Sequence, residues 1–302
     1  MWNYGEQSYD RFVWKHEGRP KKLKEVLQEE MEFSVRLLCE LKKGALVRVE
    51  GRDCPFHEVV KPDQRIEIKL TPEESEYPAE DMDLTLLYED SDVLVVEKPP
   101  YMVVHPTKGH PEHTLLNGLL AIFRQKGIRS KVRFVNRLDR DTSGILMVAK
   151  NAYAHSVLTK KNGIHSMEKV YHAFIEGHLK KKEGEIELPI ARSDDGIRRL
   201  VHESGQYALT RYRVVKTYKD AQLVEIRLKT GRTHQIRVHF SHIGSPLLGD
   251  PLYGGNGRLI QRQALHCMKL GFHSPREEGL RFVQTELPQD LKELDRRLEE
   301  GF

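Results

Sequence analysis

The stretch from Thr71 to Asp83 constrains the fold most, because it is acidic, contains two prolines and lacks apolar periodicity. Such a composition is typical of a solvated linker. A single hydrophobic core rarely grows beyond about 250 to 300 residues, so a chain of 302 residues split near this point predicts two unequal domains. We expect a small module over residues 1–75, a linker over 76–83 and a large domain over 84–302.

The N-terminal segment predicts a compact unit of helices and strands. Apolar residues recur among many charges over 21–43, which favours two short amphipathic helices. A strand over 46–49, a turn at Glu50 and Gly51, and an alternating strand around 66–68 follow.

The larger segment predicts an α+β domain built on a mixed or antiparallel sheet. Its runs of β-branched and aromatic residues indicate strands. The expected strands are 94–96, 144–149, 171–175, 207–215 and 224–228, and the expected helices are 114–126, 152–161 and 233–243. Thr233 is the expected N-cap of the last helix.

Composition narrows the possible functions. The net charge of +4 and the pI of about 8.8 lean towards a polyanionic partner. Three separated cysteines and the pair His239 and His242, without a third ligand, predict neither a disulfide framework nor a metal site. No signal pattern and no apolar run of about 18 residues is present. We expect a cytoplasmic protein without metal or cofactor, and nothing demands more than a monomer.

The segment from Arg137 to Gly144, RLDRDTSG, is the densest cluster of charge beside an apolar strand. Arg137 and Arg140 flank Asp139, and their positive charge would favour its ionised form, as a nucleophile or base requires. A salt-bridged turn with Ser143 and Gly144 at its corner explains the same residues equally well.

A second cluster, KTGRTHQIRVH, spans residues 229–239 at an expected strand-to-helix turn. A helix N-terminus favours phosphate, and Arg232 there can pair with a carboxylate or a phosphate. His234 and Arg237 follow in the first turns. The alternative is a solvated helix face with Ile236 turned inward.

Together these motifs resemble the RluA-type pseudouridine synthases over roughly residues 84–282. Four blocks match in order: VVEKPPYMVVHP at 95–106, RLDRDTSG at 137–144, KVYHAFIEG at 169–177, and TGRTHQIRVH with GDPLY at 230–239 and 249–253. Tyr101 replaces a usual glycine, and Asn136 a common histidine. The resemblance implies that Asp139 is catalytic, that Tyr171 packs against the target base, and that Arg232 pairs with Asp139.

The resemblance also implies the reaction and the partner. The chain is expected to isomerise uridine to pseudouridine in ribosomal or transfer RNA, with an S4-like RNA-binding module at its N-terminus. Expected RNA contacts near the site are Lys98, His105, Arg137, Arg140, His234 and Arg237, with further phosphate contacts from Lys160, Lys161, Arg198 and Arg199. Two alternatives stay open: a non-catalytic RNA-binding protein on the same scaffold, and a nucleosidase that releases uracil.

Overall fold

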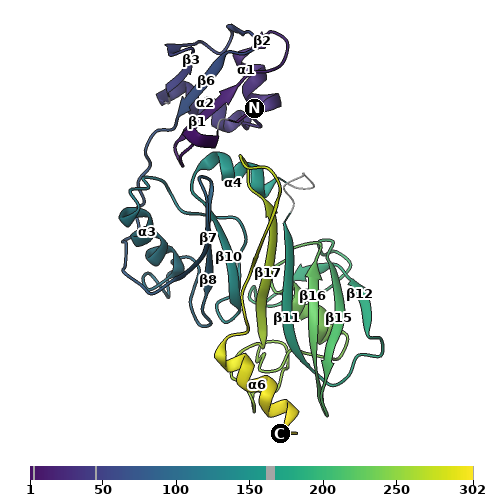
Figure 1. Ribbon diagram of the computed structural model, residues 1–302. Coiled ribbons are helices and arrows are strands. Elements are labelled where there is room, and N and C mark those ends of the chain that lie inside the picture. The colour runs from purple at the N-terminus through teal and green to yellow at the C-terminus, as the bar shows by residue number, and fades with distance from the viewer. Residues whose placement is uncertain (3, 45, 161–166, 302) are drawn as a thin grey trace.

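A computed structural model describes residues 1–2, 4–44, 46–160 and 167–301. Two separate sheets dominate it, a small one near the N-terminus and a long one that forms the body of the molecule (Figure 1). Of the helices in these ranges, none is long and apolar enough to cross a membrane.

The N-terminal unit is an antiparallel sheet in the order β1-β6-β3-β4, covered by short helices. Buried residues alternate with more exposed ones along the strands Leu46–Val49 and Arg65–Lys69, as one-sided packing requires. The elements are a 3₁₀ turn at Tyr4–Glu6, β1 Arg11–Lys15, β2 Lys21–Lys22, α1 Leu23–Glu25 with a π-helical turn Val26–Glu30, α2 Val35–Gly44, β3 Leu46–Val49, β4 Arg52–Asp53, β5 Val59–Val60 and β6 Arg65–Lys69.

The large sheet has the strand order β12-β15-β16-β11-β17-β10-β8-β7, with β18 paired to β17 and β9 to β10. Its pairs are antiparallel except β10 with β17, which makes it a mixed sheet. The strands are β7 Thr85–Glu89, β8 Val93–Lys98, β9 Arg133–Phe134, β10 Ser143–Ala149, β11 Glu168–Glu176, β12 Glu183–Glu187, β15 Leu209–Thr217, β16 Ala221–Leu228, β17 Leu265–His273 and β18 Leu280–Gln284, with a separate hairpin of β13 Ile190–Arg192 and β14 Arg199–Val201.

Four helices pack around this sheet. They are α3 Leu115–Gln125, α4 Ala152–Thr159, α5 Gln235–His242 and α6 Gln289–Glu299. Ile236 and Phe240 of α5 join the main core, and Leu291 and Leu294 of α6 join a second core under β11 and β16. Burial of these apolar side chains is the main stabilising term.

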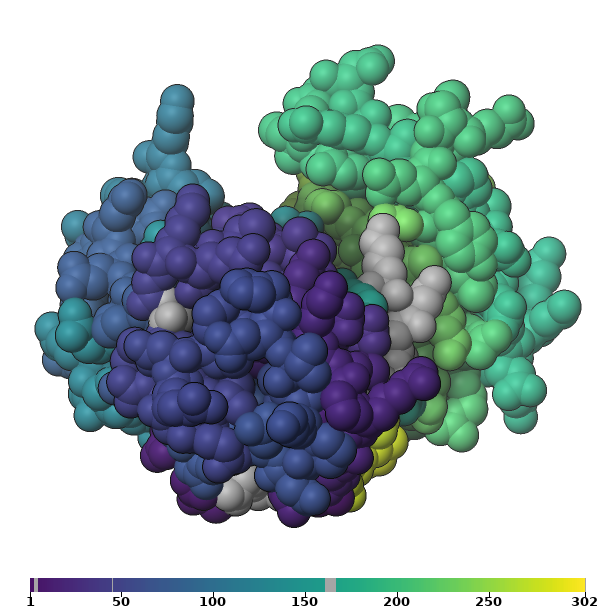
Figure 2. All heavy atoms as spheres, turned by 90° about the horizontal axis from the view of Figure 1, so that it is seen from above, coloured from purple at the N-terminus to yellow at the C-terminus, as the bar shows by residue number. Residues whose placement is uncertain are grey.

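Arg276 fixes the N-terminal unit to the body. Its guanidinium forms two 2.8 Å hydrogen bonds to Asp92 and donates to the carbonyl oxygens of Ser8 and Arg11. Tyr153 of α4 packs into the N-terminal core from the other side. Seen from above, the purple N-terminal residues lie against the body, while the green residues form a separate ridge (Figure 2).

The segment from 71 to 84 contains neither helix nor strand. It does not hang free in solvent, however. Glu73 forms an ion pair of 2.6 Å with Arg133, and Glu80 accepts a hydrogen bond from the backbone of His113. The segment is therefore fastened along the large sheet domain.

The predicted α+β class with a mixed sheet is confirmed. The N-cap of α5 is wrong by one residue: His234, not Thr233, precedes the helix, and it takes a left-handed φ of 56° without a side-chain cap.

Candidate active site

Asp139 lies on the loop that leads into β10. The turn is closed by the Thr142 amide, which donates to the Asp139 carbonyl oxygen at 3.1 Å. The carboxylate accepts a 2.9 Å hydrogen bond from Arg237 Nη1 on Oδ2, and its side chain keeps 27% of its surface exposed. It is therefore held by a cation yet open to a ligand.

Arg237 comes from the first turn of α5 and is itself fixed by a second carboxylate. Its Nε and Nη2 donate to the two oxygens of Asp250 at 2.7 and 2.8 Å, and its plane lies 4.9 Å from the Tyr253 ring centre. Asp250 is fully buried. These two carboxylates raise the pKa of Arg237 above its ordinary value, against the effect of burial. A guanidinium held by two bonds to Asp250 therefore donates a third, charge-assisted hydrogen bond to Asp139.

The expected pairing of Arg232 with Asp139 is wrong. Arg232 Nε donates instead to the carbonyl oxygen of Tyr207 at 2.9 Å. The expected contact of Arg237 with RNA is also wrong, because its side chain is only 7% exposed and its donors are engaged by carboxylates. The buried Asp250 in GDPLY was the missed signal, since a buried carboxylate needs a cationic partner.

Tyr171 of β11 lies in the same cleft as Asp139. The cleft has a volume of about 390 Å³, and its walls include Lys169, Tyr171, Arg232 and His234. Burial, with the Cys267 thiol beside it, raises the pKa of Tyr171 well above its ordinary value. The phenol is therefore neutral, and the side chain lines the cleft although it is only 5% exposed.

His234 also faces the carboxylate. Its Nε2 lies 3.8 Å from Asp139 Oδ2, and its Nδ1 shares a 2.8 Å hydrogen bond with the Tyr253 hydroxyl. Burial lowers the pKa of His234, so the ring is neutral near pH 7. It is placed to contact a ligand at Asp139 without adding charge.

Lys98 does not reach the surface, which corrects its expected contact with RNA. The side chain is fully buried, and Nζ donates to the carbonyl oxygens of Pro99, Met102 and Arg140 at 2.8, 3.0 and 2.7 Å. Burial lowers the pKa of Lys98 to about 7. Its role is to join the 99–102 turn to the Asp139 loop.

The backbone at position 144 requires a glycine. Its φ is +113°, and a Cβ there would lie 2.4 Å from the carbonyl oxygen of Cys267 on β17. No other residue fits such a close approach of two strands. Asn136 adds a second fastening, since its amide bonds the backbone of Ile145 and Met147.

The chain that carries this site is similar to known proteins. Residues 92–242 match the family model described as RNA pseudouridylate synthase. The uncharacterized RNA pseudouridine synthase YjbO of Bacillus subtilis is 40% identical over 88% of this chain and 95% of its own length. The chain belongs to the RNA pseudouridylate synthase family. It is an isomerase that converts uridine to pseudouridine in RNA.

Further relatives agree with this assignment. The ribosomal large subunit pseudouridine synthase D of Zymomonas mobilis is 38% identical over 85% of this chain and 84% of its own. The solved structure of human RNA pseudouridylate synthase domain containing 1 is 26% identical, covers 74% of this chain and 98% of its own, and superimposes with a TM-score of 0.55.

The other arginines and lysines that were expected to contact RNA differ in their position and in their ion pairs. Arg137 lines the cleft, whereas Arg140 is paired with Asp141 at 2.7 Å. Lys160 and Arg198 pair with Glu32 and Asp195, Arg199 lines a groove next to the cleft, and Lys161 lies outside the described residues. Surface pairs of this kind are weak and do not prevent phosphate contacts.

Two further expectations concern His105 as an RNA contact and the lack of a metal site. His105 is exposed, and its ring centre lies 5.3 Å from that of Tyr77, so it stays available to RNA. His239 is buried and bonds Thr210 and the Leu188 carbonyl oxygen through its two nitrogens. In the part of the chain that the structure describes, no three His, Cys, Asp or Glu side chains gather as metal ligands.

A buried network of hydrogen bonds holds the Asp139 loop in place. Ser143 Oγ lies 2.8 Å from His266 Nδ1, and Arg262 donates to both Ser143 Oγ and the Asp141 carbonyl oxygen. Arg262 also forms a bidentate pair with Asp290 at the start of α6. The C-terminal helix thus supports the Asp139 loop.

Because of this network, we expect the folded protein to lose stability as the pH falls. Burial, with Arg262 nearby, lowers the pKa of His266 to about 4. Between about 6.5 and 4 the unfolded chain binds a proton that the folded chain does not, so stability falls as pH drops through this window. We expect His266 to remove about 2 kcal/mol of unfolding free energy between pH 7 and pH 5. Denaturant unfolding at both pH values should show a smaller loss in His266→Gln; equal losses would contradict this assignment.

Proposed function

We propose that Asp139 is the catalytic carboxylate, that Arg237 positions it and that Tyr171 receives the flipped uracil. One observation carries the proposal: a partly exposed carboxylate in a cleft is held by a guanidinium that a buried second carboxylate fixes. Such preorganisation is what a group acting on a precise atom needs.

The chemistry requires one ionised carboxylate and no redox change. The bond from ribose C1′ to uracil N1 breaks, the base rotates, C1′ bonds to C5, and C5 loses its proton. Asp139 can attack the sugar, attack the base or remove a ribose proton; the first two parallel known covalent carboxylate catalysis. The nucleotide must leave its stack to reach the cleft, and stacking on Tyr171 lowers the cost of that step.

We propose ribosomal or transfer RNA as the substrate, and a monomer acting in the cytoplasm. The name of the Zymomonas mobilis relative supports ribosomal RNA. Deleting the gene and mapping pseudouridines across total RNA by chemical labelling tests this. Loss of sites in one RNA class identifies the substrate, whereas an unchanged map contradicts the proposal.

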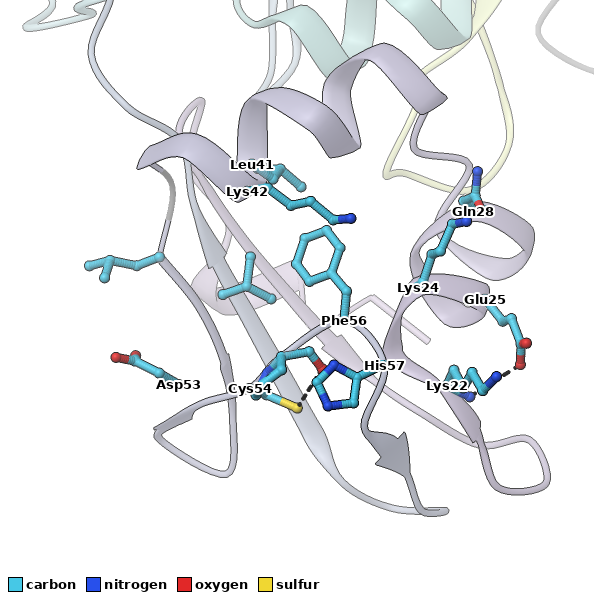
Figure 3. Close-up of a pocket in the computed structure, with 13 residues that line it drawn as sticks. Lys22, Lys24, Glu25, Gln28, Leu41, Lys42, Asp53, Cys54, Phe56 and His57 are labelled. Atoms are coloured by element: carbon cyan, nitrogen blue, oxygen red, sulfur yellow. Dashed lines mark hydrogen bonds between the residues drawn. The ribbon is translucent and has the colours of Figure 1, made fainter.

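We propose that residues 1–75 form an S4-like RNA-binding module, with 76–83 as linker and 84–302 as the catalytic domain. A hollow of about 790 Å³ in this module supports RNA binding (Figure 3). Lys22, Lys24 and Lys42 surround it, and Lys42 Nζ lies 5.5 Å from the centre of the Phe56 ring. Lysines meet phosphates, and an exposed aromatic ring stacks on bases.

Replacing Lys22, Lys24 and Lys42 together with glutamine should weaken RNA binding about tenfold at moderate salt, because each lost phosphate contact reduces counterion release. The turnover rate at saturating RNA should not change, since these residues lie outside the Asp139 cleft. Filter binding and single-turnover kinetics measure both. The matched control replaces the exposed run 180–182 with glutamines; equal weakening in the control would contradict a specific role for the module.

A further inference from the structure

Lys169 is a lysine of the active-site cleft that the roles above leave unused. It lies on β11 two residues before Tyr171, so both side chains project from the same face of the strand. Its Nζ lies 3.6 Å from the position that a Cβ on Gly231 would occupy. Lys169, Gly231 and Asp139 all line the 390 Å³ cleft.

Lys169 lacks the partners that the other buried lysines have. Lys98 is satisfied by three carbonyl oxygens, and Lys150 by Glu89 and the Asp90 carbonyl oxygen. Among the described residues, Lys169 has neither a hydrogen bond nor an ion pair, and Cys267 is the one group with an electrostatic effect on it. Burial accordingly lowers the pKa of Lys169.

The neighbours of Lys169 supply no negative charge. Burial raises the pKa of Cys267 to about 12 and that of Tyr171 above its ordinary value, so both are neutral near pH 7. Asp139 is the one carboxylate among the cleft residues that the structure describes, and Arg237 already holds it. A partly buried ammonium without an anion destabilises the fold, unless a ligand provides the anion.

We propose that Lys169 binds a backbone phosphate next to the target uridine. Phosphate is the anion that RNA presents, and a compact ammonium on a long stem suits it as a point charge. Gly231 has no side chain to block the approach, and Arg137 and Arg232 line the same cleft. The proposal rests on the proposed function, since it needs a flipped uridine at Asp139 to bring its phosphate there.

The test compares salt dependence of binding for Lys169→Met, Lys169→Arg and wild type, with a labelled uridine-rich single-stranded RNA as the probe. Lys169→Met should weaken binding about tenfold and reduce the slope of log K against log salt by about 0.7, the value for one lost phosphate contact. Lys169→Arg should keep the slope. Lys219→Met is the matched control, because Lys219 is exposed in the turn at the far end of β15 and β16 from the cleft.

Melting temperature provides the second measurement. Lys169→Met should melt at or above the temperature of wild type, because it removes a buried unpaired charge. Lys169→Gln serves if the methionine variant fails to fold. An unchanged slope in the folded variant overturns the proposal.

Pseudouridine formation by wild type, assayed in parallel, separates the two proposals. If wild type forms pseudouridine but the slope does not change, the Lys169 proposal alone fails. If the slope changes but wild type forms none, the proposed function fails, and Lys169 contacts an RNA phosphate that is not next to a target uridine.

Discussion

Arg237→Met is expected to lose at least about a hundredfold in turnover and about 3 to 5 kcal/mol of unfolding free energy. The activity falls because Asp139 loses the guanidinium that aims it at 2.9 Å. The stability falls because the fully buried Asp250 keeps its charge without a partner. Single-turnover kinetics and denaturant unfolding measure the two effects.

Two control variants separate the effect of Arg237 on the position of Asp139 from its effect on stability. Arg237→Met combined with Asp250→Asn removes the orphaned carboxylate, so it should regain most of the stability but none of the turnover. Arg232→Met should reduce turnover far less than Arg237→Met, because Arg232 bonds the Tyr207 carbonyl oxygen rather than Asp139. Equal losses of turnover in Arg232→Met and Arg237→Met would contradict the pairing described here.

Asp139→Asn is expected to lower turnover by at least about 10⁴-fold, the scale seen when a central catalytic group is removed. The amide keeps the shape of the side chain but cannot act as a nucleophile or base. Stability should change by less than about 1 kcal/mol, since Arg237 keeps its two bonds to Asp250.

RNA affinity of Asp139→Asn should be equal to or slightly tighter than that of wild type, because a negative charge facing a polyanion is removed. Chemical labelling of pseudouridine and filter binding provide the two measurements. Asp141→Asn is the matched control, as Asp141 pairs with the exposed Arg140. Wild-type turnover in Asp139→Asn would refute the proposed role.

Much of the large sheet could be predicted from the sequence, because its central strands are apolar along their whole length. The residues of β10 are all buried, and those of β8 nearly so, which makes them stand out as β-branched runs. β17 escaped prediction, since its sequence LHCMKLGFH mixes polar and apolar residues. Its polar members are accommodated by tertiary partners, such as Ser143 for His266.

The helix α6 could have been predicted. Leu291, Leu294 and Leu298 recur at helical spacing and are buried against the second core. β1 was harder to recognise, because it pairs with β6 from the opposite end of the N-terminal unit.

The choice between Arg232 and Arg237 could not be made from spacing. Both arginines lie in the same short segment, and only their partners in the fold, Asp139 for Arg237 and the Tyr207 carbonyl oxygen for Arg232, tell them apart. Asp250 lies 13 residues after Arg237, and only the folded chain shows that they meet. Likewise, the burial of Lys98 depends on carbonyl groups from two separate loops.

The most direct measurement uses RNA that carries tritium at C5 of uridine. Joining C1′ to C5 must expel that tritium into water while the base stays in the polymer. The purified protein should release tritium without releasing uracil from the RNA, and Asp139→Asn should release no tritium. Free uracil in place of tritium, or equal release by both proteins, would contradict isomerisation driven by the Asp139 carboxylate.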